Sequence, residues 1–256
     1  MISRSGLISI CLISLFALAH YYESRQDQDT AVQTDRQDSK QTPKKRARQS
    51  AKASPVDYQT IRPLFWNRLY ANGGQSLYCG KRFSGSSHRG LNVEHVFPMS
   101  WATKALQCGT RKQCRDQSEM FNQIEADLHN LYPSRTDVNQ DRSSFRFAII
   151  AGEARVYGQN CDFEVDQRGR VVEPAPTVRG DIARSMFYMA YEYRDQGLRI
   201  FSKQAKLLAN WHNADPPDDM ERRRNAQIHR LQGNQNLFIT VPQELSRLLK
   251  SGYFDN

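Results

Sequence analysis

Apolar residues are distributed differently in three parts of the chain. Residues 6–19 form an unbroken run of apolar or small residues, residues 20–55 contain almost no large aliphatic side chains, and regular apolar spacing begins at Val56. From there, residues that recur at helical spacing predict amphipathic helices. They are Ile61, Leu64, Phe65 and Leu69; Met120, Phe121, Ile124 and Leu128; Ile182, Met186, Ala190 and Tyr193; Leu207, Leu208 and Trp211; and Ile228 and Leu231.

The rest of the pattern adds short strands and turns. Residues 91–97 (LNVEHVF) alternate enough to predict a strand, and residues 137–142 are expected to form a polar turn before the apolar stretch FRFAII. The helical tail is expected to end in a polar turn at residues 232–234. We therefore predict one α+β domain over residues 56–256, mostly helical with a few short strands.

The first 55 residues have the composition of a targeting segment and a linker. Arg4, the apolar run and the ending Ala17-Leu18-Ala19 are typical of a signal peptide over residues 1–19. The run is shorter than the roughly 20 residues that a spanning helix needs, although an uncleaved leader would act as an anchor. We expect a periplasmic or secreted protein with no integral membrane domain beyond this leader. Residues 20–55 are expected to be a disordered polar and basic linker.

The chain is basic, with 36 Lys and Arg against 27 Asp and Glu, a formal charge of +9 and a pI near 9.4. Residues 56–256 keep 27 basic residues against 22 acidic ones. The excess therefore extends into the predicted domain, and it favours an anionic partner such as a polyphosphate backbone.

Four cysteines remain once the leader, with its Cys11, is set aside. An even number in an oxidising compartment favours disulfides. Cys108 and Cys114 are close in sequence, so a local bridge is the simplest of the three pairings, and it leaves Cys79 with Cys161. A zinc cluster is the alternative, but the spacings are irregular and no C-x-x-C occurs.

Three segments gather polar side chains suited to chemistry, namely residues 92–98, 125–130 and 137–142. Glu94 and His95 are neighbours on a predicted strand, so they can converge on one site only at a bend or strand end. Glu125 and His129 are expected one helical turn apart, as a solvated pair or as metal ligands. Asp141 and Arg142 are read as a local ion pair. The histidines at positions 88, 212 and 229 are read as surface or structural residues.

Taken in order, several motifs resemble the endonuclease I family of exported bacterial nucleases, within the His-Me finger (ββα-metal) group. They are EHVFP at 94–98, CGTRKQC at 108–114, MFNQIEADLHNLYP at 120–133 and DVNQDRSSFRF at 137–147. The resemblance covers roughly residues 66–239, and the agreement of separate motifs is more specific than any one of them. It implies a ββα-metal core within the domain.

The resemblance also implies the metal and the base. His95 corresponds to the general base, and Glu94 and Asn139 correspond to the protein ligands of one divalent cation. Two oxygen ligands, with water completing the shell, suit Mg²⁺, and Mn²⁺ or Ca²⁺ can substitute for binding. Where relatives often carry Gly in a V-N-G-D-R motif, this chain has Gln140, which would alter the turn if that backbone needed a positive φ.

Arg111, at the middle of the Cys108–Cys114 loop, corresponds to the residue that binds the phosphate in relatives. Glu125 and Asn130 fall in a matching segment, and we expect them to orient the ligands or the base. Relatives carry more cysteines near Tyr78-Cys79-Gly80, so fewer bridges are expected here.

The leading hypothesis is therefore a metal-dependent, sequence-nonspecific endonuclease that hydrolyses DNA, with RNA as a further substrate, and acts as a monomer. Binding is expected through the phosphate backbone, because no sequence-reading motif is present. The alternative is a non-catalytic nucleic-acid-binding or uptake protein on a nuclease scaffold. A thiol hydrolase that uses a cysteine with His129 is a third idea, and export and the even cysteine number argue against it.

Overall fold

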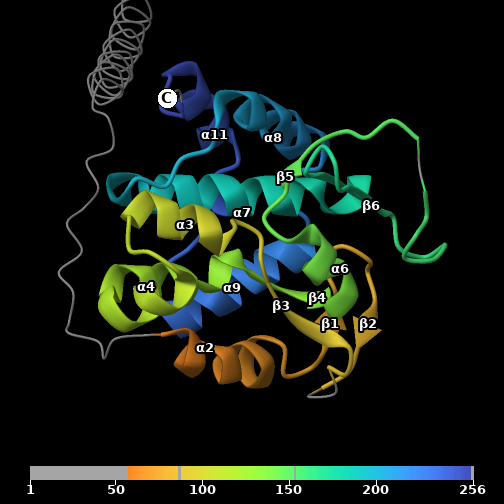
Figure 1. Cartoon of the computed structure of the whole chain (residues 1–256), viewed down its shortest axis with the longest axis horizontal. Helices are drawn as coiled ribbons and strands as arrows, with labels where there is room; N and C mark the ends of the chain where they lie inside the picture. Colours follow the sequence, from red (N-terminus) through yellow and green to blue (C-terminus); the bar gives the residue numbers. More distant parts are fainter. Residues whose placement is uncertain (1–56, 86–87, 153, 255–256) are drawn as a thin grey trace, which may run out of the picture. The chain divides into compact units, whose positions relative to one another are not determined.

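A long buried helix, α7 (Arg179–Glu192), runs through the centre of the structure (Figure 1). The structure is a computed structural model that describes residues 57–85, 88–152 and 154–254, all within the compact unit Ala53–Asn256. Helix α8 (Ser202–Ala214) packs along α7. Ile182, Met186 and Ala190, spaced for one helical face, are almost fully buried, so the helix predicted from this spacing is confirmed.

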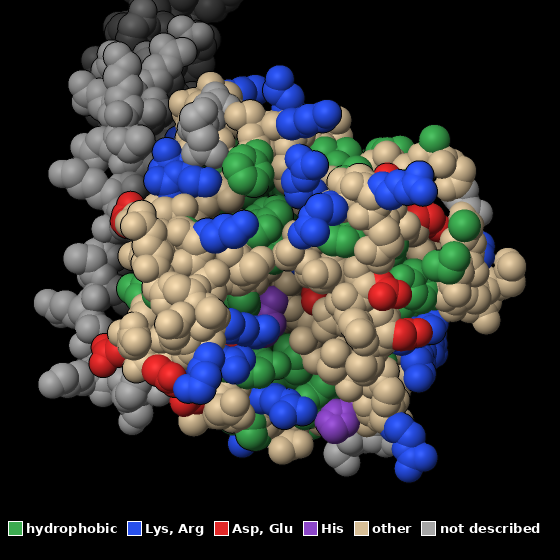
Figure 2. All heavy atoms as spheres, viewed as in Figure 1, with side chains coloured by type: hydrophobic (Ala, Val, Ile, Leu, Met, Phe, Trp, Pro, Cys, Tyr) green, Lys and Arg blue, Asp and Glu red, His purple; other side chains and the backbone are tan. Residues whose placement is uncertain are grey.

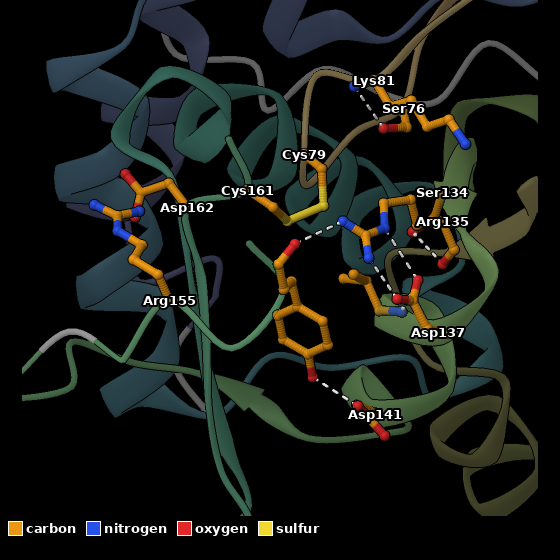
Figure 3. Close-up of a disulfide and its surroundings, with 12 residues drawn as sticks. Ser76, Cys79, Lys81, Ser134, Arg135, Asp137, Asp141, Arg155, Cys161 and Asp162 are labelled. Carbon is orange, nitrogen blue, oxygen red and sulfur yellow. Dashed lines mark hydrogen bonds and ion pairs between the residues drawn. A yellow bond between two sulfur atoms is a disulfide. The ribbon is translucent and has the colours of Figure 1, made fainter. Parts of the chain in front are cut away.

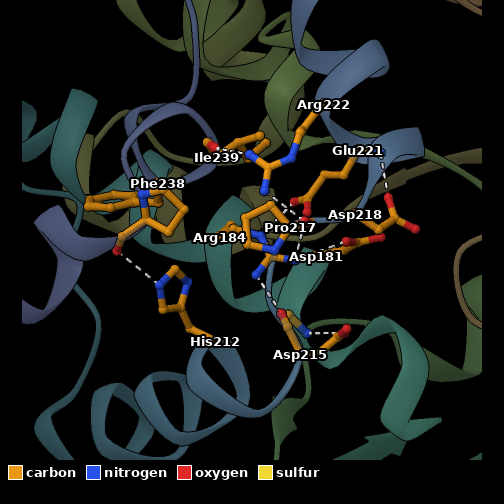
Figure 4. Close-up of polar contacts among 12 residues, drawn as sticks. Asp181, Arg184, His212, Asp215, Pro217, Asp218, Glu221, Arg222, Phe238 and Ile239 are labelled. Atoms are coloured by element: carbon orange, nitrogen blue, oxygen red, sulfur yellow. Dashed lines mark hydrogen bonds and ion pairs between the residues drawn. The ribbon is translucent and has the colours of Figure 1, made fainter.

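A buried arginine joins α7 to α9 (Asp219–Gln232), as Figure 4 shows. Arg184 on α7 lies 2.6 Å from the Glu221 carboxylate on α9, and it also pairs with Asp181. Its Nη1 donates to the backbone oxygen of Asp215, just beyond α8. A buried charge is tolerated when it is paired and hydrogen-bonded in this way, and the network links three helical segments.

The strands form three small sheets. Strands β3 (Leu91–His95) and β4 (Leu131–Arg135) pair antiparallel, with His95 opposite Leu131. Helix α6 (Thr136–Arg142) follows β4 directly and contacts both strands. The other sheets are β1 (Gly74–Gln75) with β2 (Arg82–Phe83), and β5 (Arg146–Phe147) with β7 (Val171–Pro174) and β6 (Phe163–Asp166).

Several short helices surround the β3–β4–α6 unit. The first is α2 (Tyr58–Leu64), which continues into the π-helical turn η1 (Phe65–Leu69). Helices α3 (Met99–Leu106), α4 (Arg111–Gln117) and α5 (Glu119–Glu125) contact one another. Thr110 forms a capping box at the start of α4, and Ser118 caps α5, so each helix begins at a residue whose side chain satisfies a free backbone N–H.

Two sequence expectations about helix ends are wrong. Helix α5 ends at Glu125, and Leu128–Asn130 form a separate 3₁₀ turn, η2, so Glu125 and His129 do not share a helix. The chain also does not finish its helices at residues 232–234. Short helices α10 (Leu237–Thr240) and α11 (Gln243–Lys250) follow, and they bury the side chains of Phe238, Ile239, Leu245 and Leu248. The remaining 3₁₀ turns are η3 (Pro176–Val178) and η4 (Arg194–Gln196).

The structure contains the two disulfides predicted from the sequence, Cys79–Cys161 and Cys108–Cys114. Cys79–Cys161 joins two segments that lie 82 residues apart in sequence (Figure 3). Near it, the hydroxyl of Tyr157 donates to Asp141 on α6 at 2.7 Å. The expected local ion pair between Asp141 and Arg142 is therefore wrong, because Asp141 contacts Tyr157 and Arg142 pairs with Glu94.

The α+β class and the mostly helical single domain are confirmed. The predicted signal peptide and linker lie outside the described residues. Among the described residues, none of the helices has the length and apolar character to cross a membrane.

Candidate active site

A cavity of about 540 Å³ opens between the β3–β4–α6 unit and helices α3 and α4. Figure 2 shows a hollow in this face, with a His side chain inside it and Lys and Arg side chains around it. The cavity lining includes Glu94, His95, Arg111 and Asn139, so four residues singled out from the sequence face one space. A larger cavity of about 790 Å³ shares no lining residue with it and has no His in its wall.

His95 is the last residue of β3 and is only 8% exposed. Its Nε2 lies 2.9 Å from the backbone oxygen of Glu125. A carbonyl oxygen only accepts hydrogen bonds, so Nε2 carries the proton and Nδ1 keeps a lone pair. Burial, together with the nearby Arg111 charge, lowers the pKa of His95 to about 4. The imidazole is therefore neutral near pH 7.

Glu94, also buried, is held by one of its two carboxylate oxygens. The hydroxyl of Tyr78 donates to Oε1 at 2.7 Å, and Nε of Arg142 lies 3.2 Å from the same atom. Within the described residues, Oε2 has no side-chain hydrogen-bond or ion-pair partner, and the backbone N–H of His95 also contributes a hydrogen bond to the carboxylate. Burial raises the pKa of Glu94, and the Arg142 charge opposes that shift. The arrangement leaves one carboxylate oxygen for a ligand.

Asn139 lies in α6, so the polar turn predicted for residues 137–142 is wrong. Its side-chain Nδ2 donates to Oδ1 of Asn92 at 2.8 Å and to the backbone oxygen of Val93 at 3.2 Å. Both amide hydrogens are thereby used, and Oδ1 is left as an acceptor. Gln140 sits within the same helix and is not among the residues with positive φ, so replacing the family's Gly causes no strain there.

Arg111 is the first residue of α4 and does not lie in the middle of a loop as expected. Its Nε donates to Oε1 of Glu125 at 2.5 Å, and Arg115 donates to both carboxylate oxygens of Glu125 at 2.7 and 2.8 Å. Although burial alone would raise the pKa of Glu125, the hydrogen bonds and charges of the two arginines hold it below its usual value. The carboxylate is therefore ionised.

Asn130 fixes the chain where β3 leads into α3. It accepts from the backbone N–H of Phe97 at 2.6 Å and donates to the Phe97 carbonyl at 3.0 Å. Pro98 then caps α3. Because the strand ends at His95 and the chain turns here, the neighbours Glu94 and His95 both line the cavity.

Four contributing residues were missed by sequence reasoning, namely Tyr58, Tyr78, Arg115 and Arg142. The sequence did indicate that Arg115 belongs to the site, because it follows Arg111 by four residues and so lies on the same helical face. Arg142 is 1% exposed and donates to the Val96 carbonyl at 2.6 Å. A buried arginine at the end of a polar motif could not be told from a solvated one by pattern alone.

Comparison with known proteins identifies the family of this chain. The sequence profile of the endonuclease I family matches residues 22–243. The chain belongs to the endonuclease I family and is a nucleic-acid-cleaving hydrolase, so the resemblance inferred from the motifs is confirmed.

Several relatives are similar over most of their length. An extracellular deoxyribonuclease of Aeromonas hydrophila is 38% identical over 74% of this chain and 92% of its own. A periplasmic deoxyribonuclease of the same organism is 37% identical over 67% of this chain and 81% of its own. An extracellular ribonuclease of Bacillus subtilis (strain 168) is 30% identical over 68% of this chain and 58% of its own.

Proposed function

We propose that this protein is an exported, metal-dependent and sequence-nonspecific endonuclease that hydrolyses DNA and accepts RNA. The observation that carries the proposal is the single cavity in which a neutral His95 lies beside Glu94, Asn139 and Arg111. The β3–β4–α6 unit, which supplies three of these side chains, is the candidate for the ββα-metal core.

The donor atoms of this cavity fit one divalent cation. Oε2 of Glu94 and Oδ1 of Asn139 are both oxygen ligands without side-chain partners among the described residues, and the other polar side-chain atom of each residue is held by hydrogen bonds. Hard cations such as Mg²⁺ prefer oxygen ligands and retain water in the remaining positions. When bound, the cation would stabilise negative charge on the phosphate and on the departing oxygen.

His95 is placed to act as the general base. Its Nε2–H is fixed by the carbonyl of Glu125, and its free Nδ1 can take a proton from a water that attacks phosphorus. A base that is already neutral near pH 7 needs no prior deprotonation. Arg111 offers both Nη groups, because only its Nε is bound to Glu125, and a guanidinium donates well to phosphate oxygens.

The substrate range follows from the kind of contacts available. The cavity presents cations and hydrogen-bond donors suited to phosphate, and phosphate contacts carry no sequence information. Relatives named deoxyribonuclease and ribonuclease both match the chain, and hydrolysis by an activated water does not require a 2′-hydroxyl. The extracellular and periplasmic relatives support action outside the cytoplasm.

Supercoiled plasmid DNA and a single-stranded RNA test this proposal. The purified protein should degrade both in Mg²⁺, and EDTA should abolish cleavage. His95→Ala should lower turnover by about 10²–10⁴-fold and still bind DNA. His229→Ala removes an exposed imidazole outside the cavity and should leave turnover unchanged. Binding without cleavage by the wild-type protein would favour the non-catalytic alternative.

A further inference from the structure

Helix α4 places two arginines, Arg111 and Arg115, on one wall of the active-site cavity. They are four residues apart, a spacing that makes their side chains neighbours with Cβ atoms about 5–6 Å apart. Both are held by the carboxylate of Glu125, whose side chain is fully buried. The two arginine side chains remain 45% and 35% exposed. The pair is therefore fixed in place and still accessible from the cavity.

The cluster of Arg111, Arg115 and Glu125 has hydrogen-bond donors without a partner among the described residues and a net positive charge. One carboxylate offsets one of the two positive charges, so the cluster keeps a net charge of +1. Both Nη groups of Arg111 and Nη1 of Arg115 have no hydrogen-bond partner within the described residues. Arg115 alone, which donates to both carboxylate oxygens of Glu125, would neutralise this carboxylate. The guanidinium of Arg111 is therefore not needed to balance the charge of Glu125.

Tyr58 closes the remaining side of the two arginines. Its ring centroid lies 5.9 Å from Cζ of Arg111 and 5.5 Å from Cζ of Arg115, and 5.3 Å from the His95 ring. With the Nε edges bound to Glu125 and Tyr58 beside the guanidinium groups, the free Nη groups are the donors left to the cavity. This geometry suits two anionic groups side by side.

We propose that Arg115 binds a second phosphate of the substrate, adjacent to the scissile phosphate that Arg111 binds. The inference rests on the proposed nuclease function and deepens it, since it specifies that the enzyme engages two successive phosphates of one strand. Successive phosphates advance by about 3.4 Å along a duplex axis and farther along the backbone itself, a distance that neighbouring arginines can span. A polynucleotide is then preferred over an isolated phosphodiester.

The salt dependence of DNA binding counts phosphate contacts and so tests the proposal. In a His95→Ala background, whose slow turnover keeps the duplex intact during the measurement, the Kd for a 20-base-pair duplex is measured between 50 and 300 mM salt. Each lost phosphate contact should reduce the slope of log Kd against log salt by about 0.9. Arg111→Gln and Arg115→Gln should each reduce it by about 0.9, and the two together by about 1.8.

Two further variants separate phosphate binding from a structural role. Arg115→Lys keeps the positive charge but cannot form the two hydrogen bonds to Glu125. Its slope of log Kd against log salt should therefore equal that of the His95→Ala parent. Lys112→Gln removes a charge from the same helix at a position outside the cavity and should also retain it. Circular dichroism and thermal unfolding check that each variant is folded, and Arg115→Met replaces Arg115→Gln if the latter is not.

Three outcomes would overturn the inference. If the double variant loses only about 0.9 in slope, both arginines hold one phosphate. If Arg115→Gln leaves the slope unchanged, Arg115 does not contact phosphate. If Arg115→Lys reduces the slope as much as Arg115→Gln, Arg115 acts only by holding Glu125. If the wild-type protein cleaves DNA and any of these slopes is found, this inference alone is refuted. A wild-type protein that neither binds nor cleaves DNA refutes the proposed function with it.

Discussion

Replacing Arg142 with Met should destabilise the protein strongly, because Arg142 is the buried counter-ion of Glu94. Both side chains are almost fully buried, at 1% and 4% exposure, and Nε of Arg142 lies 3.2 Å from Oε1 of Glu94. Removing one partner of a buried ion pair costs about 3–5 kcal/mol, since the other charge is left without compensation. Tyr78 would remain as the only side-chain donor to Glu94 among the described residues.

Two backbone carbonyls also lose a donor in Arg142→Met. Arg142 donates to the oxygens of Val96 at 2.6 Å and of Ser143 at 2.9 Å. An unsatisfied buried carbonyl costs about 1–3 kcal/mol, but a shift of Glu94 toward its neutral form would remove part of the charge penalty. We therefore expect a loss of about 4 kcal/mol in the free energy of unfolding at pH 7, measured by urea denaturation.

A double variant identifies the source of this loss. In Glu94→Gln/Arg142→Met the uncompensated charge is gone, while Gln can still accept from Tyr78. Most of the stability should return, leaving a deficit of about 1–3 kcal/mol from the buried Val96 carbonyl, because Ser143 is exposed and water can bind its carbonyl. The reasoning is refuted if Arg142→Met alone costs less than about 1 kcal/mol, or if the double variant is as unstable as Arg142→Met.

Three further predictions concern the cavity itself. Asn139→Leu should raise the Kd for Mg²⁺ or Mn²⁺, measured by calorimetry, by at least about tenfold, and an unchanged Kd would remove Asn139 from the metal site. Glu125→Gln should cost about 1–2 kcal/mol of stability at pH 7, a modest value because its arginine partners are partly exposed. Since the folded pKa of Glu125 lies below its ordinary value near 4.3, that contribution is present above this pH and is lost as the pH falls through the folded value. The difference from wild type should thus shrink at pH 3, and a constant difference in urea midpoints would contradict the assignment. Tyr58→Ala should lower kcat/KM on DNA by roughly 5–30-fold, from two cation–π contacts of about 0.5–1 kcal/mol each, whereas Tyr58→Phe should retain activity. Equal losses in the two variants would place the effect in the hydroxyl and not in the ring.

The helices that the sequence predicted correctly are those with several apolar residues at regular spacing. Helix α7 is the clearest case, because Ile182, Met186 and Ala190 mark one buried face. Helix α6 was missed because its sequence, TDVNQDR, offers Val138 as its one apolar residue. Its position depends on packing against β3 and β4 and on the burial of Arg142, which are contacts that local periodicity does not report.

The residues of the candidate site also divide into those that the sequence identified and those that it did not. The motifs identified Glu94, His95, Arg111 and Asn139, and the structure places all four around one cavity. The partners that orient them come from far along the chain. Tyr78 precedes Glu94 by 16 residues, and the Glu125 carbonyl follows His95 by 30. Such pairings depend on how strands and helices pack, so the spacing of residues in the sequence carries no signal for them.

Glu125 contacts both the proposed base and the arginines proposed to bind phosphate, and it does so through different atoms. Its backbone carbonyl fixes the tautomer of His95, and its carboxylate holds Arg111 and Arg115. Because every residue supplies a carbonyl, replacing the Glu125 side chain with Gln weakens the arginine contacts and keeps the contact to His95. Glu125→Gln should therefore weaken phosphate binding, and raise KM, far more than it alters the protonation of the base. An equal shift in the pH profile of kcat would mean that the carboxylate also acts on His95.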